Sequence, residues 1–549
     1  MNEKDNDKSF ENLPACAAEF ITLVIKKMRY RSKVRHEVMT ELIGHFEDEL
    51  KDCKSDDEKN QRVEKLINEF GDAKVLAVLL RRAKKRCRPL WRTIVARTFQ
   101  TVGVLIVCLI VYAGWFFTGR PKITTNYLAH SNRLARPVAD ESLNAGLIYA
   151  QAAKVFEKLP DKPSKLLRKK YTEITDEEKD LIRQVLKDNQ DTLQMVIAGT
   201  EKPYYWQKYG SDGDANELIT VLMPNLADYR QITWALGWRA WLSAEDGRFE
   251  SAFADLISCY RFGQHLRGDK SLIEQLVGIA IEALSLQATR DILSRYEVEP
   301  SALAKLQSDL ENVISAGDFG ISLKLERLLI YDELQRFFTD DRLGGGHLYL
   351  PRLRYLSRMD PPFISGKDAD FLDEAAQMAH ILFTHPNKSQ TSRSIMQLYD
   401  YCERLAAKSA AQVHSEKESL DTRIQRLATK NIFIGTFVTD IGRIITISQR
   451  SPTEVNANLV IISALRYKQQ RGDYPGTLEE LTAGGYLKEL PMDSFSDKPL
   501  VYRKTDDGFM LYSVGQNFID DGGQYGKDKT GEVKLWADDG DAVFWPAAQ

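Results

Sequence analysis

The stretch that decides the organisation of this chain is FQTVGVLIVCLIVYAGWFF, from Phe99 to Phe117. Among its nineteen residues, Gln100 is the only strongly polar one. At a rise of about 1.5 Å per residue, such a helix is roughly 28 Å long, close to the roughly 30 Å core of a bilayer. Few buried helices of globular domains are apolar on all sides over this length. The sequence therefore predicts one transmembrane helix, within a juxtamembrane and spanning segment at residues 89–120.

The residues on the two sides of this helix differ in charge. Residues 81–97 hold eight Lys and Arg and no acid, whereas Arg120 and Lys122 are the only charges just after the span. Positive residues collect on the cytoplasmic side of membrane helices, so the amino-terminal segment is predicted to be cytoplasmic and residues 118–549 extracytoplasmic. About ninety residues precede the span, which excludes a cleaved signal peptide. The predicted location is the inner membrane of a bacterium.

Length and composition fit a protein of several domains. The chain has 549 residues, a formal net charge of −3, 43% hydrophobic and 28% charged residues. Residues 1–98 carry 22 basic against 17 acidic side chains, a net of +5, which leaves −8 for the remainder. Attraction to anionic lipid headgroups explains the basic cluster beside the span, so no nucleic-acid partner is predicted.

Within the predicted domain at residues 1–88, residues 9–84 show helical periodicity throughout. Gly71 can end one helix and Asp72 can cap the next. Two apolar series recur at helical spacing: Val34, Val38, Leu42, Ile43 and Phe46, then Val63, Leu66, Ile67 and Phe70. The segment Glu-Val-x-x-Glu-Leu-x-x-His-Phe-Glu-Asp, followed by Glu-Phe-Gly-Asp and Leu-Ala-x-x-Leu, resembles the HAAS-type domain at the cytoplasmic amino terminus of bacterial membrane proteins. That resemblance covers about eighty residues and implies an all-helical signalling module with a regulatory protein partner.

Two histidines in this module raise the question of a metal site. Glu41 and His45 are four residues apart on one helical face, but nine residues separate His36 from His45. The spacing is not that of a His-Glu-x-x-His zinc site. The resemblance implies instead that His45 lies at a surface between helices.

Residues 121–450 are predicted to form a large extracytoplasmic helical domain. Within it, RAWLSAEDGRFESAFADLISCYRFG, residues 239–263, resembles one tetratricopeptide hairpin in the spacing of its small and large apolar residues: Ala240, Gly247, Phe249, Ala252 and Leu256. No 34-residue recurrence is evident, and solenoids need about three stacked units. Two interpretations stay open, a concave surface for a peptide or protein and ordinary helix packing. A long break at residues 342–370 is typical of a functional loop or a cover.

Residues 451–549 show a different pattern. A helix bearing Leu459, Ile462 and Leu465 is predicted to end at Gly472, before a Tyr-Pro turn. Thr477 and Glu480 then have the spacing of a helix cap. Beyond them, PLVYRK and GFMLYSV alternate as two strands joined by Asp506, Asp507 and Gly508, which is a hairpin signal. The Arg-Gly-Asp at 471–473 is thus predicted to be a helix exit rather than an adhesion motif.

The succession Gly-x-Tyr-Pro, Leu-x-x-Leu, Gly-Tyr-Leu, Leu-Pro-x-Asp, Pro-Leu-x-Tyr and Gly-Phe-x-Leu-Tyr-Ser-x-Gly resembles the globular head of the major pseudopilin of type II secretion. It covers roughly the last ninety-five residues. A pseudopilin carries its processing site and membrane helix at its extreme amino terminus, whereas here some 330 residues lie between span and head. The resemblance therefore implies a borrowed head and not a subunit that polymerises into a pseudopilus.

The pseudopilin resemblance also implies a calcium site in the Asp-rich carboxy-terminal loop. Hard cations take six to eight oxygen ligands. The candidate ligands are Ser513, Asn517, Asp520, Asp521, Asp539 and Asp541. Asn517 stands about where the family has an acidic ligand, and an insertion moves the last two aspartates away. A solvated acidic loop without calcium is an equal alternative.

Cysteines and histidines give little sign of chemistry. Cys259 and Cys402 lie on the predicted outer side, where a disulfide is permitted but not required. The histidines of that region lack metal spacing, and no phosphate loop, dinucleotide fingerprint or Gly-x-Ser-x-Gly motif is present. The sequence favours a protein that is not an enzyme and that needs no cofactor apart from the candidate calcium.

The predicted fold class is mainly α: a cytoplasmic helical domain at residues 1–88, one transmembrane helix, a large helical extracytoplasmic domain at 121–450 and a small α+β pseudopilin-like domain at 451–549. The leading functional hypothesis is non-enzymatic binding and signalling across the membrane, with protein partners on both sides. The alternative is a scaffold or assembly component of a secretion or pilus-like system. A third hypothesis is an extracytoplasmic hydrolase with its site under the loop at residues 340–370.

Overall fold

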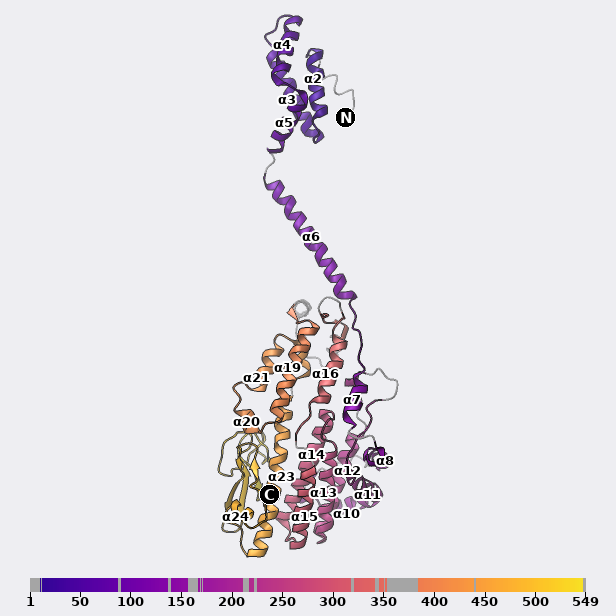
Figure 1. Ribbon diagram of the computed structural model, residues 1–549, viewed down its shortest axis with the longest axis vertical. Coiled ribbons are helices and arrows are strands. Elements are labelled where there is room, and N and C mark those ends of the chain that lie inside the picture. The colour runs from indigo at the N-terminus through magenta and orange to yellow at the C-terminus, as the bar shows by residue number, and fades with distance from the viewer. Residues whose placement is uncertain are drawn as a thin grey trace. The chain divides into compact units, whose positions relative to one another are not determined.

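The computed structural model describes residues 10–546 apart from residues 11, 87–89, 137–139, 157–165, 168, 170, 211–216, 222–224, 317–319, 341–344, 350, 353–383 and 439–440. It divides into two compact units, Met1–Phe117 and Thr118–Gln549. Both consist largely of helices, and the strands gather near the carboxyl end (Figure 1). The prediction of a mainly α protein is confirmed.

The described part of the first unit contains four helices and all but the last residue of a fifth. They are α2 (Ala15–Lys27), α3 (Ser32–Leu50), α4 (Asp56–Phe70), α5 (Ala73–Arg86) and α6 (Leu90–Thr118). Phe46 is fully buried, and its ring lies 6.4 Å from Phe20 and 5.6 Å from Phe70. Gly71 has a φ of +73°, which glycine adopts easily, and Asp72 accepts a hydrogen bond from the Lys74 amide. The predicted helix boundary at Gly71 and Asp72 is confirmed.

Three helices in the described chain are long and apolar enough to cross a membrane: Ile94–Thr118, Leu272–Arg295 and Ile432–Arg471. Their most apolar windows differ in burial, with 0% of the first buried inside the protein, 61% of the second and 44% of the third. These helices fit a membrane protein. The sequence predicted a single span, and the structure offers three candidates by length and composition.

The second unit begins with a helical layer. Its described helices are α7 (Tyr127–Ala135), α8 (Gly146–Val155), α10 (Asp176–Asp188), α11 (Gln190–Thr200), α12 (Leu226–Glu245), α13 (Phe249–His265), α14 (Leu272–Arg295), α15 (Pro300–Ala316) and α16 (Lys324–Phe337). The predicted hairpin is confirmed as α12 and α13, which are joined through Gly247 at a φ of +77°. Ala240, Ala252 and Leu256 are buried in it as expected.

Helices α13 and α14 approach each other closely at two glycines. A Cβ added to Gly278 would lie 2.6 Å from the Gly263 carbonyl oxygen, so no larger residue fits without a shift of backbone. One turn away, Arg267 donates to Glu282 over 2.9 Å, and each of these side chains is 2% exposed. Gln264 donates to the other Glu282 oxygen over 2.9 Å. A buried ion pair thus connects Arg267, just after the end of α13, with Glu282 of α14.

A second group of helices follows the long break. It comprises α19 (Lys388–Ala406), α20 (Ala410–His414), α21 (Leu420–Ala428) and α22 (Ile432–Phe437). Their apolar residues form a cluster with Ile330, Leu334 and Phe337 of α16. The chain just after α6 is tied to the same region. Gln335 accepts from the Thr124 and Thr125 amides and donates to the Thr125 carbonyl oxygen.

The carboxyl-terminal part has the predicted order of elements. The helix α23 (Ile441–Arg471) ends before Gly472, which has a φ of +87°, and α24 (Leu478–Ala483) follows. The strands are β1 (Met492–Asp493), β2 (Lys498–Pro499), β3 (Val501–Lys504), β4 (Phe509–Ser513) and β5 (Ala542–Trp545). β3, β4 and β5 form an antiparallel sheet in that order, with Val501 opposite Tyr512. The predicted helix exit and hairpin are confirmed.

One detail of this region differs from the prediction. The Thr477 side chain makes no capping hydrogen bond to α24, although it is the residue before that helix. The Glu480 carboxylate accepts instead from the Tyr467 hydroxyl over 2.9 Å. Leu478 and Leu481 of this helix are buried, and their burial stabilises it without the predicted capping box.

The helical layer and the carboxyl-terminal sheet share one hydrophobic core. Its members come from two stretches of the chain, from Ala145 just before α8 to Val313 on α15, and from Val455 on α23 to Trp545 on β5. The helix α23 packs against α14 and α15 on the helical side and against β1, β4 and β5 on the other. The residues on either side of the predicted boundary at 450 and 451 therefore lie in a single compact unit.

Candidate functional site

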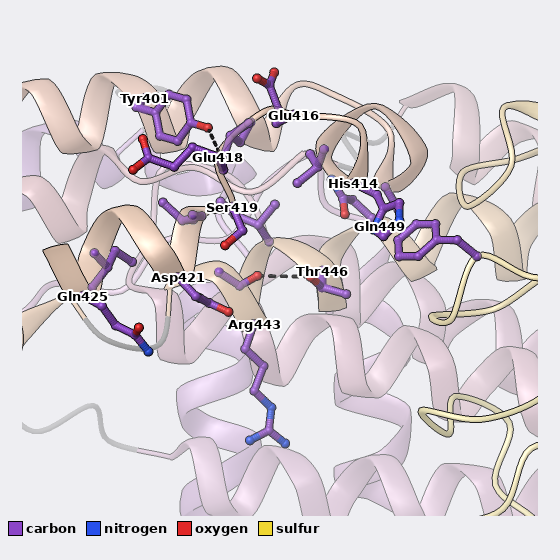
Figure 2. A pocket seen from close by; sticks show the side chains of 18 residues that line it. Tyr401, His414, Glu416, Glu418, Ser419, Asp421, Gln425, Arg443, Thr446 and Gln449 are labelled. Atoms are coloured by element: carbon purple, nitrogen blue, oxygen red, sulfur yellow. Dashed lines mark hydrogen bonds between the residues drawn. The ribbon is translucent and has the colours of Figure 1, made fainter.

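A groove of about 620 Å³ lies where α19, α20, α21 and the first turns of α23 meet the loop after β4. Two short helices in its wall begin at serine caps: Ser409 accepts from the Gln412 amide and Ser419 from the Thr422 amide. Such caps satisfy amides that a helix start leaves unpaired. The volume lies within the range of about 300–1,000 Å³ usual for small-molecule sites. Figure 2 shows the lining side chains.

The groove has an apolar floor and a polar rim. Leu405, Leu420, Ile424 and Ile445 come from the buried cluster below it. The polar lining side chains are Tyr401, His414, Glu416, Glu418, Ser419, Asp421, Gln425, Arg443, Thr446 and Gln449 (Figure 2). Sites that hold a small ligand commonly combine an apolar body with a few polar groups that fix its orientation.

Carboxylates outnumber cations in this lining. Three carboxylates and one guanidinium give a formal charge of −2 with His414 neutral, from −3 and +1. Two carboxylates already have partners. Glu416 pairs with Lys408, and Glu418 accepts two hydrogen bonds from Arg426, each 3.1 Å long. Asp421 is exposed and makes no ion pair within the described residues. The groove therefore presents Asp421 as its available anionic group.

The carboxyl-terminal region closes one wall of the groove. The rings of His414 on α20 and Phe518 in the loop after β4 stack at 4.0 Å between centroids and 17° between planes. Phe518 has a φ of +60°, which is uncommon for a residue with a side chain. On the opposite side, the Tyr401 hydroxyl donates to the Glu418 carbonyl oxygen over 3.2 Å. Residues more than one hundred positions apart thus form one site.

The six candidate calcium ligands are only partly brought together. Asn517 donates to Asp521 over 2.7 Å, and Asp541 accepts from the Asp521 and Gly523 amides. Ser513 donates instead to Asp493 over 2.8 Å, and Asp539 accepts from the Lys527 amide. Asp520 accepts from Tyr512 over 2.9 Å. In the described chain no group of three or more His, Cys, Asp and Glu side chains is placed to hold a metal.

Asp493 is the residue of this loop region that the sequence did not single out. It is 1% exposed, and it accepts from the Phe495 and Val514 amides as well as from Ser513. Burial raises the pKa of its carboxyl group, while these hydrogen bonds act in the other direction. Its position as the aspartate of the Leu-Pro-x-Asp segment was the feature of the sequence that could have indicated its importance.

Calcium binding stays a prediction, and it has a direct test. A ligand at about 100 times its dissociation constant adds about 2.7 kcal/mol to the free energy of unfolding. If the loop binds calcium, the protein should melt at a higher temperature with calcium than with a chelator, and Asp521→Ala should abolish the difference. Equal melting temperatures in both solutions would leave the solvated acidic loop as the correct alternative.

Other sequence candidates occupy structural positions. The His45 ring lies 5.5 Å from Phe70 of the next helix, as the interhelical placement predicts, and Glu41 accepts from Lys84 over 2.6 Å. Cys259 and Cys402 are both buried and free, in different hydrophobic clusters, so the possible disulfide is not formed. The hydrolase hypothesis concerned residues 340–370, most of which lie outside the described residues.

A buried group of polar aromatic residues around His265 was also missed by the sequence analysis. The His265 Nε2 lies 3.0 Å from the Lys202 carbonyl oxygen and its Nδ1 lies 2.8 Å from the Tyr149 hydroxyl. Because a carbonyl oxygen can only accept, Nε2 carries the proton and Tyr149 donates to Nδ1. These bonds satisfy a neutral imidazole, which is the arrangement of a structural histidine.

Burial lowers the pKa of His265 to about 4, with the positive charge of Lys270 adding to the effect. An unfolded histidine has a pKa of about 6.5, so the unfolded state binds more protons between these values. The stability contributed by the neutral imidazole is complete above about pH 6.5 and falls as the pH drops towards 4, by about 3 kcal/mol in all. Urea titrations at several pH values should show this loss, and His265→Gln should flatten it. An unchanged slope in this variant would contradict the assignment.

Comparisons with known proteins add no assignment. No family model matches the chain, and no curated protein or solved structure matches it.

Proposed function

We propose that the protein is a single-pass membrane receptor or relay, which binds a ligand or protein segment in the groove and communicates with a partner of the amino-terminal helices. In this proposal Ile94–Thr118 is the span, residues 1–88 are cytoplasmic and the second unit is extracytoplasmic. Support for the choice of span comes from its exposure, since 0% of its most apolar window is buried inside the protein. The basic residues before it support the orientation.

The two other apolar helices are better explained as core helices. The helix α14 carries Glu282, which pairs with Arg267 inside the protein, and it packs against α12, α13 and α23. The helix α23 carries Glu454, which accepts from the Trp536 indole over 2.6 Å. A charged side chain at the centre of a bilayer is costly, whereas here each has a protein partner.

The observation that carries the proposal is a single hydrophobic core that lies under the groove and also includes α16. This helix in turn contacts the membrane-proximal segment. Groove residues Leu405, Ile424 and Ile445 belong to the same buried cluster as Ile330 and Leu334 of α16. The last turn of α16 binds the segment after the span through Gln335, and the Asp340 amide donates to the Arg120 carbonyl oxygen over 3.2 Å. Close-packed cores transmit small displacements. Occupation of the groove can therefore shift the chain where it leaves α6.

The topology is tested by protease treatment of sealed cells. Protease added outside should digest residues after the span and spare the first ninety, and the protein should resist carbonate extraction. Digestion of the amino-terminal residues instead, or release by carbonate, would contradict the single inside-to-outside span.

The binding and relay steps need a variant that fills the groove. Thr446 is half-buried in the lining, and its replacement in Thr446→Trp adds a large ring there. A photo-crosslinking residue at Gln425 in the groove should capture a ligand or partner in cells, and this capture should disappear in the Thr446→Trp background. The same residue at Thr429, which is exposed beyond the groove, is the control.

The relay is tested by gene expression. Cells that carry Thr446→Trp should show the transcriptional change of cells in which residues 1–80 are deleted, because both break the same path. If the two strains show different transcriptional changes, or none, the groove does not communicate with the amino-terminal helices. The proposal would then be reduced to binding in the groove.

A further inference from the structure

The helix α5 has two different faces. Towards the module, Ala77 is buried, Leu80 is half-buried and the Lys84 amine donates to Glu41 of α3. On the other face, Val75 is 57% exposed, Val78 37% and Leu79 55%. These three apolar side chains stand at spacings of three and four residues, so they form one patch on the helix surface. The patch is not part of the core of the module.

Basic residues continue this exposed face towards the carboxyl end of α5. Arg81, Arg82 and Lys85 are exposed, and Arg82 lies one turn beyond Val78 and Leu79 on the same side. From Ala73 to Phe117 the sequence contains no Asp or Glu. An apolar stripe flanked by Lys and Arg is the pattern of a helix that lies in a membrane interface.

The covalent chain keeps this face close to the bilayer. The helix α5 ends at Arg86 and α6 begins at Leu90, so four Cα steps separate them. At no more than about 3.6 Å per residue, the two ends are within about 14 Å of each other in any arrangement. The candidate span itself begins at Ile94. The span therefore holds α5 near a lipid surface at all times. Because the two are already in one chain, contact with the lipid requires no separate association step.

We propose that α5 is an interfacial helix, which inserts Val75, Val78 and Leu79 between the lipids of the inner leaflet while its arginines and lysine bind anionic headgroups. This inference rests on the proposed function for its membrane span and orientation. Burial of the three side chains supplies the apolar contribution, and each basic residue near an anionic surface strengthens the binding further. The flexible stems of Arg and Lys can reach headgroups from beside buried apolar residues.

Charge favours lipid over the other possible occupants of this face. A second copy would bring the same Arg81, Arg82 and Lys85 against themselves, and like charges repel. An anionic leaflet has an apolar interior for the three apolar side chains and negatively charged headgroups for the basic residues. One surface therefore accommodates both parts of the pattern. The consequence for function is that the cytoplasmic module is held against the membrane, with α5 as the contact.

The test uses the full-length protein in nanodiscs that contain a phosphatidylcholine with a photoactivatable group on its acyl chain. Labelled peptides are identified by mass spectrometry, in phosphatidylcholine alone and in a mixture with phosphatidylglycerol. Peptides of residues 73–86 should be labelled, and more strongly in the anionic mixture. Val75→Asp/Leu79→Asp should reduce this labelling about tenfold, because two carboxylates replace the apolar contacts. Gln61→Asp/Asn68→Asp, which adds the same charge at exposed positions of α4, should leave it unchanged.

The labelling of residues 94–118 separates this inference from the proposed function. If the span is labelled and α5 is not, the interfacial helix is wrong and the topology stands. If neither is labelled, the proposed span is wrong as well. Labelling of α5 that is equal in the two lipid mixtures, or equal in the Asp variant and the control, would also overturn the inference, as would concentration-dependent protection of α5 by a second copy. Circular dichroism of each variant should show the same helix content, since the four positions are exposed.

Discussion

A chain that ends at Arg450 should fail to fold its second unit. The truncation removes the part of α23 that packs against α14 and α15, together with the sheet on its other side. Among the lost core residues are Val460, Ile461, Leu511 and Phe544, all at most 1% exposed. Each buried side chain of this kind contributes about 1.5–3 kcal/mol. Since a whole domain is stable by only about 5–15 kcal/mol, the loss exceeds what the unit can tolerate.

The measurement is limited proteolysis and thermal unfolding of the truncated chain in detergent. Complete digestion of residues 118–450 and the absence of a cooperative transition are expected. The matched control deletes residues 2–88 and should leave the melting of the second unit unchanged, because the first unit has its own core. A truncated chain that still melts cooperatively would show that the helical layer is an independent domain.

Breaking the buried ion pair of Arg267, just after α13, with Glu282 of α14 should have the next largest effect. Arg267→Ala leaves Glu282 2% exposed without its cation, and removal of one partner of a buried pair costs about 3–5 kcal/mol. The close approach of Gly263 and Gly278 beside the pair leaves little room for relaxation or for entry of water. Urea unfolding of the full-length protein should show a matching decrease in the free energy of unfolding of the second unit.

Two further variants separate charge burial from packing. The double change Arg267→Met/Glu282→Leu should restore most of the lost stability, because apolar residues of similar volume often replace a buried pair at little cost. The exposed pair Lys305 and Glu250, at 55% and 60% side-chain exposure, should contribute less than about 1 kcal/mol when broken. A double variant as unstable as Arg267→Ala would mean that packing around these side chains, and not the unpaired charge, sets the cost.

Local patterns predicted much of the fold. Helical spacing located the buried faces of α3 and α4, with Val38, Phe46 and Val63 in the core. Turn residues located the boundaries, as with Gly71, Gly472 and the hairpin between β3 and β4. These features depend on neighbours within a few positions, and such neighbours are visible in the sequence. The prediction of a cap at Thr477 was wrong, because α24 is stabilised by burial against residues that are distant from it in the sequence.

The groove could not be predicted in the same way. Its walls come from α19, α21, α23 and Phe518, which approach one another only when the helices are packed. The serine caps at Ser409 and Ser419 were the local signal, and they indicate two short helices but not a cavity. The calcium hypothesis shows the same limit: Asn517 and Asp521 are neighbours as the spacing suggests, whereas Ser513 is drawn away by Asp493.

The position of α23 near the end of the chain has a consequence for biosynthesis. The helices α12 to α15 are complete once residue 316 has been made, but the core they share is completed by strands that end at Trp545, 229 residues later. At synthesis rates of about 5–20 residues per second, this interval is about 10–50 s. Until α23 has been made, the apolar side of α14 lacks the helix that packs against it in the folded protein. The nascent second unit is therefore expected to need a chaperone until Trp545 has been made, and ribosome-bound chains stalled before residue 450 should be protease-sensitive.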